Sequence, residues 1–470
     1  NPDVDLVVVD TSNSEAHLSL GKPRCKNHRI IIKMLHTQGL PVYIAVSTGG
    51  TFALSANNPI VTLFFDDCHW TIEDNARDVY SFYPTTQQGP TLLLECFKAG
   101  EGGENLPEAV AVSADGNTAA IGSPSDDTGN GAVWIYVRKC GVWEKQAKLY
   151  GALTSGASAQ GSSVSLSADG NTLAVGGPED NTGIGAVWVF VRDECGKWTQ
   201  QGSKLVVAFD PLVFSIVRAT GTSVDLSADG NTLVVGSPST VLIAPPMNSG
   251  LVTVFNRSAG TWTQGPNVIS TTPLVSTGTP TRLQGTRVSI SADASVIAES
   301  GLDAAIIFSL LGNVLTQVQV LESPDPGNNF GLGGLDLSAD GLNLAIGATG
   351  EPPNGAVYIY VNVAGVWTLQ GLPIRTANLL SSPALFGTSV SFSGDASTLA
   401  VGAHDDGVTE GATFVFTRTA TNWVEREKLV GPPSQGSVNQ GSSVALSSEG
   451  NTLIVGNVAQ NNNPMFWVWV

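Results

Sequence analysis

Charged residues are scarce in this sequence, and cations are the scarcer kind. Asp, Glu, Lys and Arg make up 13% of the 470 residues, about half the usual share for a soluble domain. Lys and Arg number 22 against 40 acidic residues, so the formal net charge is −18. Nucleic acids and anionic lipids are bound largely through clustered Lys and Arg. The composition therefore argues against both partners, and the surface must be covered mostly by uncharged polar residues and Gly.

Cysteines and long apolar runs are also few. The 5 Cys form an odd and small set, which rules out a disulfide scaffold and predicts at least one thiol that is free or paired between chains. No apolar run approaches the roughly 20 residues that span a bilayer, and no secretory hydrophobic segment is visible. Membrane insertion is therefore not expected. Because the chain begins at Asn1 rather than Met, a missing leader or a longer N-terminal region stays open.

A short repeat dominates the rest of the chain after an N-terminal segment. Ser-Ala-Asp-Gly occurs at 113–116, 167–170, 227–230 and 338–341, with looser copies at 291–294, 393–396 and 447–450. The seven copies are 54, 60, 64, 47, 55 and 54 residues apart, and their third position is always acidic. Self-similarity at this period indicates one supersecondary unit that recurs seven times.

The second copy shows how each unit is organised. Short runs rich in β-branched and aromatic residues occupy 161–167, 172–176, 186–192 and 197–205, and such runs predict strands. The Ala-Asp-Gly-Asn sequence between the first two runs suits a tight hairpin, because Asp tolerates the turn and Gly adopts positive φ. Four strands in meander order form one blade of a β-propeller. The sequence therefore predicts an all-β fold with a seven-bladed β-propeller.

The two ends of the propeller region complement each other. The final repeat ends at 465–470, in the third strand of its blade, and the segment 86–93 matches the fourth-strand region at 199–206. An N-terminal strand would complete the last blade and close the ring, which removes exposed sheet edges. The fourth unit departs from the pattern at Glu299-Ser300-Gly301. We expect the usual strand order there with a less regular outer edge.

Phe-Gly pairs and Gly-x-Pro elements at equivalent positions resemble the FG-GAP family of propeller repeats, best known from integrin α subunits. The pairs are Phe330-Gly331 and Phe386-Gly387, with Gln160-Gly161, Gln284-Gly285 and Gln440-Gly441 in other units, and the Gly-x-Pro elements lie at 122–124, 176–178 and 236–238. The repeats look most like those of proteins from giant DNA viruses and some bacteria. The resemblance covers about four-fifths of the chain and implies a fold rather than an activity.

Calcium-binding members of that family carry several carboxylates in the first hairpin, which together supply the oxygen ligands of one ion. Here each hairpin offers a single carboxylate, such as Asp169. We interpret this Asp as a turn former. The sequence predicts no metal site, no cofactor and no cofactor-binding residue.

Residues 1–80 lack the repeat. Apolar runs at 29–35, 42–46, 61–65 and 70–72 predict strands separated by turns. The segment resembles small β-domains of tail-fibre and giant-virus surface proteins, which implies anchoring or trimerisation. The predicted organisation is a small N-terminal β-domain at 1–80 for anchoring or oligomerisation and the FG-GAP-like propeller at 81–470. A β-cap on one face of the propeller is the alternative.

Four of the five His and two Cys lie in the N-terminal segment, where Cys25, His28, Cys68 and His69 could suggest zinc. Their spacing does not match a standard paired-ligand pattern, and a Cys25–Cys68 disulfide is favoured over zinc. Cys140 and Cys195 occupy equivalent turns in adjacent units. Adjacent blades diverge outward, whereas disulfides need Cα atoms within about 7 Å, so free surface thiols are predicted there.

Acidic pairs lie in the predicted loops between second and third strands, at 126–127, 179–180 and 405–406. We interpret them as solvated turn carboxylates rather than cation or partner contacts, and no two are demonstrably placed as a glycosidase pair. Tryptophans at equivalent positions predict packing between blades rather than a sugar platform. They are Trp134, Trp143, Trp188, Trp198, Trp262, Trp367 and Trp423. No nucleophile elbow, phosphate loop or metalloprotease helix is present, so no catalytic residue is predicted.

Propeller geometry places these loops and the connections between blades on one face, where a ligand would bind. We therefore expect a non-enzymatic structural or interaction protein on a virion surface, as a capsid-associated, fibre or spike component. Its expected partners are capsid or fibre proteins, a host receptor, glycans, or further copies joined through the N-terminal domain. A secreted or cell-surface adhesin or lectin is the alternative. A propeller hydrolase comes third, and carboxylates converging on the central channel would favour it.

Overall fold

The computed structural model describes most of the repeat region and, before it, only strand residues. The described residues are 4–9, 16–20, 29–34, 42–46, 51–54, 60–65, 70–73, 80–81, 95–98, 109–139, 141–208, 214–242, 250–268, 283–325, 327–380, 384–407, 410–420, 422–431, 439–457 and 465–469. The chain divides into two compact units, one built mainly from Asn1–Thr91 and the other from most of the chain after that point.

The N-terminal strands form two sheets. In the five-stranded sheet the order is β1 (Val4–Val9), β3 (Arg29–Met34), β6 (Ile60–Phe65), β7 (Trp70–Glu73) and β8 (Tyr80–Ser81). The three-stranded sheet contains β2 (Ala16–Leu20), β4 (Val42–Val46) and β5 (Thr51–Leu54). The four predicted strands are confirmed as β3, β4, β6 and β7. The apolar pattern did not single out the other four.

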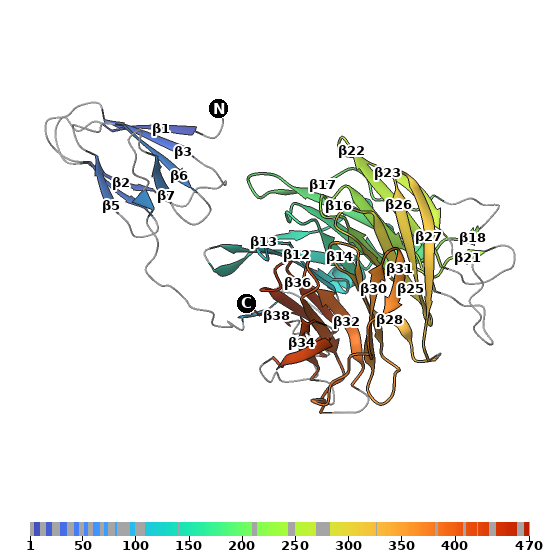
Figure 1. The fold of residues 1–470 in the computed structure, drawn as a ribbon. Helices are drawn as coiled ribbons and strands as arrows, with labels where there is room; N and C mark the ends of the chain where they lie inside the picture. Colours follow the sequence, from blue (N-terminus) through green and yellow to red (C-terminus); the bar gives the residue numbers. More distant parts are fainter. Residues whose placement is uncertain are drawn as a thin grey trace. The chain divides into compact units, whose positions relative to one another are not determined.

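Six four-stranded antiparallel blades of a β-propeller arise within the described part of the chain, each from one repeat (Figure 1). Blade 1 contains β10 (Ala109–Val112), β11 (Thr118–Ser123), β12 (Ala132–Lys139) and β13 (Val142–Leu149). Blade 2 contains β14 (Ser163–Leu166), β15 (Thr172–Gly177), β16 (Ala186–Arg192) and β17 (Trp198–Gln200). Blade 3 contains β19 (Ser223–Leu226), β20 (Thr232–Gly236), β22 (Val252–Ser258) and β23 (Thr261–Val268).

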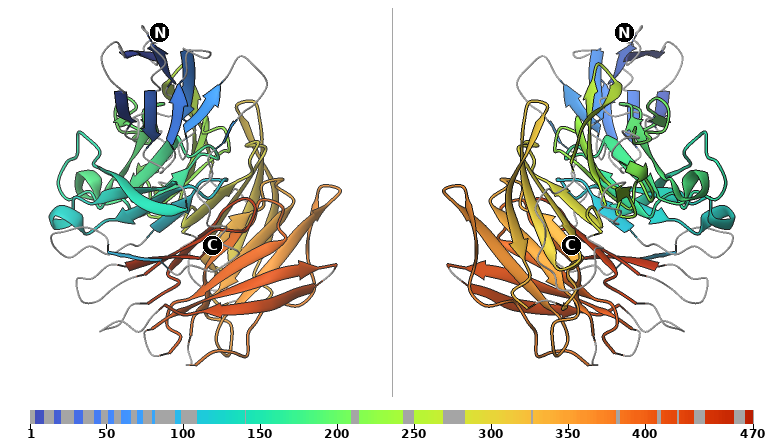
Figure 2. Two further views of the ribbon diagram at one scale, coloured as in Figure 1. Left: turned by 90° about the vertical axis from the view of Figure 1, so that its left-hand side faces the viewer. Right: turned by 90° about the vertical axis from the view of Figure 1, so that its right-hand side faces the viewer.

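The next three blades repeat this order, and the colours from cyan to red follow the order of the repeats (Figure 2). Blade 4 contains β24 (Arg287–Ile290), β25 (Val296–Gly301), β26 (Ala304–Leu311) and β27 (Val314–Glu322). Blade 5 contains β28 (Phe330–Leu337), β29 (Asn343–Ala348), β30 (Ala356–Val363) and β31 (Val366–Leu369). Blade 6 contains β32 (Phe386–Phe392), β33 (Thr398–Ala403), β34 (Ala412–Thr419) and β35 (Asn422–Leu429). A short pair, β18 (Phe214–Ile216) and β21 (Val241–Leu242), stands apart from the blades in sheet order.

A further four-stranded sheet, the closing sheet, joins the two ends of this unit. It contains β36 (Ser443–Leu446), β37 (Leu453–Gly456), β38 (Met465–Trp469) and β9 (Glu95–Lys98). An N-terminal strand does pair with the last repeat, and Trp467 lies opposite Cys96. The segment 86–93, which was expected to supply this strand, lies outside the described residues. Cys96 is part of the closing strand β9.

The hairpin between the first two strands of each repeat is built as the sequence predicts. In blade 2 the Asp169 carboxylate accepts hydrogen bonds from the Ser167 hydroxyl at 2.5 Å and from the Asn171 backbone N–H at 2.9 Å. Gly170 has a φ of 66°, which favours Gly over other residues. The same carboxylate contacts recur at Asp115, Asp229, Asp293, Asp340 and Asp395. The turn-forming role of this Asp is confirmed.

Backbone hydrogen bonds also link each of these turns to the next. The second turn residue donates its N–H to the carbonyl of its counterpart in the following repeat, at distances of 2.8 to 3.2 Å. Each residue of the series donates to the one after it, and the last donates to the first. The series is Ala114, Ala168, Ala228, Ala292, Ala339, Gly394 and Ser448. The turns therefore form a closed cycle at one end of the inner strands.

The hydrophobic core lies between neighbouring blades. Each large cluster combines residues from two successive blades, as Trp188 of blade 2 does with Ile135 of blade 1, and Phe330 of blade 5 with Ile307 of blade 4. Trp188 and Phe330 are fully buried. A sheet buried on both faces has apolar residues at successive positions, which explains the continuous burial of strands such as β15.

Blade 4 is shorter than its neighbours but not less regular. Only Leu302 and Asp303 join β25 to β26, which accounts for the short repeat spacing. Its outer strand β27 has 9 residues, against 3 in β17 of blade 2. The expected irregular outer edge is wrong, because alternating exposed and half-buried residues maintain a hairpin with β26 without the Trp of other repeats.

Candidate functional site: the central channel and the anchored loops

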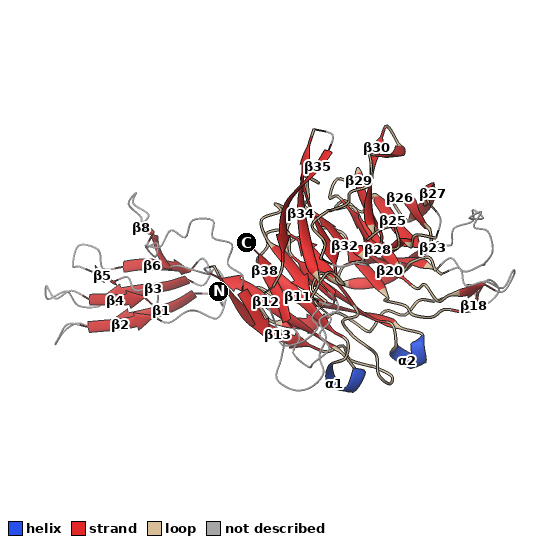
Figure 3. Cartoon of the chain, turned by 90° about the horizontal axis from the view of Figure 1, so that it is seen from below, coloured by secondary structure: helices blue, strands red, loops and turns tan. Residues whose placement is uncertain are grey.

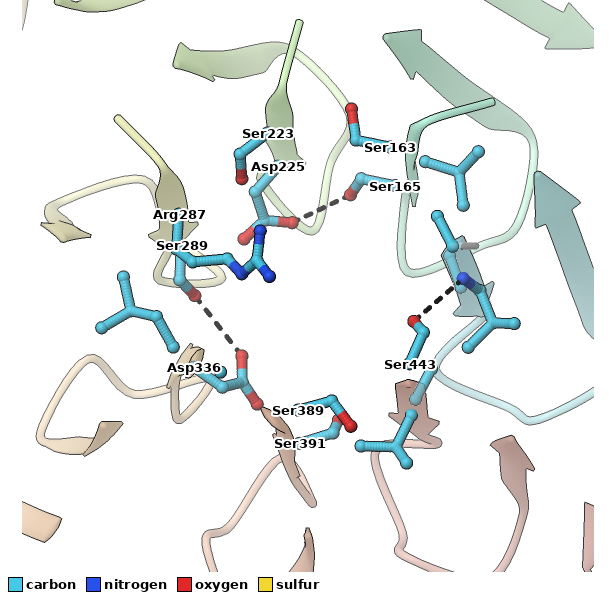
Figure 4. A pocket seen from close by; sticks show the side chains of 18 of the residues that line it. Ser163, Ser165, Ser223, Asp225, Arg287, Ser289, Asp336, Ser389, Ser391 and Ser443 are labelled. Carbon is cyan, nitrogen blue, oxygen red and sulfur yellow. Dashed lines mark hydrogen bonds between the residues drawn. The ribbon is translucent and has the colours of Figure 1, made fainter. Parts of the chain in front are cut away.

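The inner strands of the blades line a channel with a cavity of about 330 Å³ (Figure 4). Side chains of a strand alternate between its two faces, so two residues of each inner strand face the channel and the residues between them enter the core. The first positions form tier A, which consists of Ala109, Ser163, Ser223, Arg287, Gly334, Ser389 and Ser443. The second positions form tier B, which consists of Ala111, Ser165, Asp225, Ser289, Asp336, Ser391 and Ala445.

Tier B side chains bond one blade to the next. The inner strand is the edge of its sheet, and buried edge N–H groups need acceptors. Tier B supplies them at 2.7 to 3.1 Å: Ser165 accepts from Leu226, Asp225 from Ile290, Ser289 from Leu337, Asp336 from Phe392 and Ser391 from Leu446. These side chains therefore stabilise the interfaces between blades.

The two acids of tier B have shifted pKa values. Burial raises the pKa of Asp225 to about 6, against the hydrogen bonds from Ile290 and Ser165 that favour its charged form. Burial, together with the nearby charge of Asp225, raises the pKa of Asp336 to about 7. Ser289 lies between these carboxyls and donates to Asp336 at 3.4 Å. The channel thus holds two coupled carboxyls that carry a proton more readily than a solvated Asp.

Arg287 of tier A reaches into the channel (Figure 4). Its Nε donates to the Gly333 carbonyl at 3.2 Å and its Nη1 to the Thr286 carbonyl at 3.3 Å. Burial lowers the pKa of its guanidinium. Among the described residues no carboxylate lies within ion-pair distance of it, so tier A carries a cation without a protein counter-ion.

A third shifted acid, Glu299, lies in blade 4 away from the channel. It occupies the position of Val235 in blade 3 and Val175 in blade 2, and it is 1% exposed. Its Oε2 accepts the Gly285 N–H at 2.8 Å. Burial raises the pKa of Glu299 to about 8, so near neutral pH this carboxyl is mostly protonated.

The loops between second and third strands are anchored by buried acids. Asp126, Asp180 and Asp406 have side chains at most 4% exposed and pair with Lys148, Lys204 and Lys428 at 2.5 to 2.6 Å. In blade 5, Glu351 pairs with Arg375 at 2.5 Å. The interpretation of the acidic pairs as solvated turn carboxylates is therefore wrong for these three Asp. A carboxylate held this close to a cation in the protein interior is a structural contact.

The same acids connect the two kinds of loop that were expected to share a face. Asp180 accepts the Ser155 N–H at 2.8 Å and Asp406 accepts the Leu380 N–H at 2.5 Å, and both donors lie in connections between blades. Bridges such as Gly185–Thr220 join the end of the loop to the next connection. The short segments α1 (Asp126–Gly129) and α2 (Asp180–Gly183) project from the same side of the propeller (Figure 3). The shared face is confirmed for these loops.

Five of the seven tryptophans lie in or against clusters between blades, as expected. Trp134, Trp143, Trp188, Trp198 and Trp367 are buried, and Trp262 and Trp423 are partly buried against interblade clusters. Outer-strand hydrogen bonds add to this packing: Trp198 Nε1 donates to Gln146 at 2.8 Å and Trp262 Nε1 to Gln201 at 2.9 Å. Their role in packing leaves little ring surface for a sugar.

The predictions for Cys and His divide between described and undescribed residues. Cys195 is disulfide-bonded, so the expectation of a free thiol is wrong at this turn. Cys25, His28, Cys68, His69 and Cys140 lie outside the described residues. No group of three or more His, Cys, Asp or Glu that could hold a metal occurs among the residues the structure describes. Likewise, no helix in the described part of the chain is long and apolar enough to cross a bilayer.

The channel residues were missed by sequence reasoning, although a signal was present. Aligning the repeats on Ser-Ala-Asp-Gly puts Arg287, Asp225 and Asp336 at positions where other repeats carry Ser, Ala or Gly. Glu299 likewise replaces an aliphatic residue. A charged residue at one repeat's copy of a small or apolar position indicates either a local compensation or a site.

A scan against protein families finds no family that matches the chain. A search of curated proteins finds no significant relative either.

Proposed function

We propose that the repeat region is a complete seven-bladed, FG-GAP-like propeller whose seventh blade is the closing sheet. The closed cycle of turn bonds from Ala114 through Ser448 supports this count, and so does the pairing of β38 with β9. We further propose the division into a small N-terminal β-domain at 1–80, for anchoring or oligomerisation, and the propeller at 81–470.

We propose that the protein is a non-enzymatic structural or interaction component of a virion surface, in a capsid-associated, fibre or spike position. The observation that carries this proposal is the anchored loop face. Buried ion pairs such as Lys204–Asp180 hold the loops, while Asp127 and Glu179 beside the anchors are exposed. Binding surfaces of propellers and other scaffolds are commonly loops held on a rigid frame. The partner would be a capsid or fibre protein or a host receptor.

A secreted or cell-surface adhesin of lectin type is the alternative, with glycans as partners. A glycan array separates the two, because a strong and specific signal for one sugar favours the lectin. A hydrolase is less well supported, although Asp225 and Asp336 both line the channel. Each accepts a backbone N–H of the next blade, and this structural role accounts for their presence.

The deciding experiment is immunogold labelling of intact native particles and cells with an antibody to the propeller. Label on virions supports a surface component. Label confined to host or bacterial surfaces, with bare virions, contradicts the virion proposal and favours the adhesin. If purified propeller competes with particle attachment, Glu179→Lys on the loop face is expected to reduce competition. Glu427→Lys, an equal charge reversal on exposed Glu427 of the outer strand β35, serves as the matched control.

A further inference from the structure

The channel presents a cation that no described residue of the chain neutralises. Arg287 uses two of its five N–H groups on backbone carbonyls, and the rest have no acceptor among the described residues. Removing a guanidinium from water is costly unless an anion or several acceptors replace the lost hydration. The two channel acids lie in tier B, and neither Asp225 nor Asp336 is within ion-pair distance of Arg287. The site is therefore electrostatically incomplete.

Hydroxyl groups around the same cavity have donors to spare. The Ser223 oxygen accepts the Val288 N–H at 3.0 Å, the Ser391 oxygen accepts from Leu446 at 3.1 Å and the Ser443 oxygen accepts from Val110 at 3.2 Å. In the described structure none of these three hydroxyls donates a hydrogen bond. A hydroxyl that already accepts through its oxygen offers its proton to a ligand. The cavity therefore has donors for an oxygen-rich anion.

The remaining wall suits a molecule larger than an inorganic ion. Counted around the cycle of turn bonds, blade 1 and the closing sheet lie opposite blade 4. They contribute Ala109, Ala111 and Ala445 to the lining, which leaves apolar space across from Arg287. Ser163 and Ser389 donate to backbone carbonyls and can accept from a ligand hydroxyl. The volume of about 330 Å³ is at the lower end of small-molecule sites.

We propose that the central channel binds a small hydroxylated carboxylate, of the sugar-acid class. The ligand carboxylate pairs with Arg287 and accepts from Ser223, its hydroxyls bond the other serines and the tier B carboxyls, and its C–H face packs on the alanine wall. Arg pairs with carboxylates in a bidentate, charge-assisted geometry that Lys cannot reproduce. This proposal is independent of the loop face and of the virion setting.

The test is calorimetric titration of the full chain with glucuronate, alongside glucose and inorganic phosphate. Glucuronate is expected to bind in the millimolar range or tighter and glucose at least about tenfold more weakly, because charge-assisted hydrogen bonds are the stronger kind. Arg287→Gln is expected to lower glucuronate affinity at least about tenfold. Arg218→Gln, the same change at exposed Arg218 in a connection between blades, is the matched control and should bind normally.

A second variant guards against misfolding of Arg287→Gln. Ala109→Leu fills the opposite wall without removing the cation and should also abolish binding, while thermal unfolding shows that both variants fold. Equal affinity for glucose and glucuronate, unchanged affinity in a folded Arg287→Gln, or no binding of glucuronate would each overturn the proposal. Binding of phosphate without glucuronate would reduce the site to a simple anion site and overturn the sugar-acid class.

Discussion

Blade 2 and blade 4 reach the same four-stranded architecture with different residues at the contact between neighbouring blades. In blade 2, Gly176 packs against Gly221 so closely that an added Cβ would lie 2.0 Å from the Gly221 carbonyl oxygen. In blade 4, Ser300 occupies the equivalent position and its hydroxyl donates to the Gly331 carbonyl at 2.6 Å. Blade 2 achieves contact by removing the side chain, whereas blade 4 fills the space with a hydrogen bond.

The second difference concerns the backbone N–H that follows each connection. Gly161 and Gly221 donate to the backbone carbonyls of Gly176 and Gly236 at 3.0 Å. Gly285 donates to the Glu299 carboxyl instead. Blade 4 is therefore irregular in sequence but satisfied in hydrogen bonding. From blade to blade the same buried backbone groups keep a hydrogen-bond partner, although the residues that supply the partner differ.

The largest expected loss of stability concerns the close contact between Gly176 and Gly221. Gly176→Ala is expected to cost about 3 kcal/mol or more of unfolding free energy, because the clash is with backbone and cannot relax by a side-chain rotation. Ser300→Gly should cost only about 1 kcal/mol, the loss of one hydrogen bond. Urea unfolding of the two variants measures the difference. Similar costs for both would contradict the close-contact account.

The second largest loss concerns the loop between the second and third strands. In blade 2 this loop is anchored by an ion pair, whereas in blade 4 it is a two-residue turn. Lys204→Met leaves the 1% exposed Asp180 side chain without its cation and is expected to cost about 2–3 kcal/mol. Lys197→Met, at an exposed Lys of the same blade, should be nearly neutral. Adding Asp180→Asn to Lys204→Met should recover stability. A further loss in the double variant would show that the acid acts mainly through the Ser155 N–H.

Glu299 makes the stability of blade 4 depend on pH. Its pKa is about 8 in the folded chain against a usual 4.5, so the folded state keeps a proton that the unfolded state has lost between these values. Unfolding free energy therefore falls as pH rises through this window. Glu299→Gln keeps an acceptor for Gly285 without a charge, and we expect a gain of about 4 kcal/mol at pH 8.5 and little change at pH 4.

Denaturant unfolding across this pH range measures that gain, and Asp225 and Asp336 should leave a smaller slope of the same sign. Val175→Gln, the equivalent position in blade 2, should instead be destabilising at every pH because no donor awaits the amide. An unchanged pH slope in Glu299→Gln would contradict the assignment.

The smallest expected effects on stability come from the tier B serines of blades 2 and 4. Ser165→Ala removes one acceptor of the Leu226 N–H, but Asp225 still accepts from that group at 3.0 Å. Ser289→Ala removes the oxygen that accepts the buried Leu337 N–H at 3.1 Å and leaves that N–H only a weaker contact with Asp336. We expect costs of about 0.5 and about 1.5 kcal/mol, measured by thermal unfolding. The reverse order would show that the Asp336 contact of Ser289, rather than the N–H group, dominates.

Much of the fold could be predicted from local patterns. The runs of β-branched and aromatic residues at 172–176 and 186–192 matched β15 and β16, and the Ser-Ala-Asp-Gly turn was found at each expected place. Blade 4 was misjudged because the missing Trp was taken as a sign of irregularity, whereas β27 is held by its pairing with β26. The disulfide state of Cys195 was also misjudged, because the bonding of a Cys depends on contacts that its neighbours in the sequence do not show.

The candidate site was less predictable than the fold. The acidic loop pairs were recognised, but burial of Asp126, Asp180 and Asp406 depends on lysines about 22 to 24 residues away along the chain. No pattern within a loop distinguishes a solvated Asp from one that lies over a neighbouring strand. The channel acids were not recognised at all, since each looked like an ordinary variation of a strand residue.

The sequence by itself determined the repeated unit, its strand alternation and its turn chemistry, because these depend on residues a few positions apart. The tertiary structure alone decided that Asp225 accepts from Ile290, that Asp336 accepts from Phe392 and that Arg287 faces the channel with no counter-ion among the described residues. These contacts join residues about 60 positions apart. They exist only because successive sheets pack in register around one axis, which brings one face of every inner strand into the same cavity.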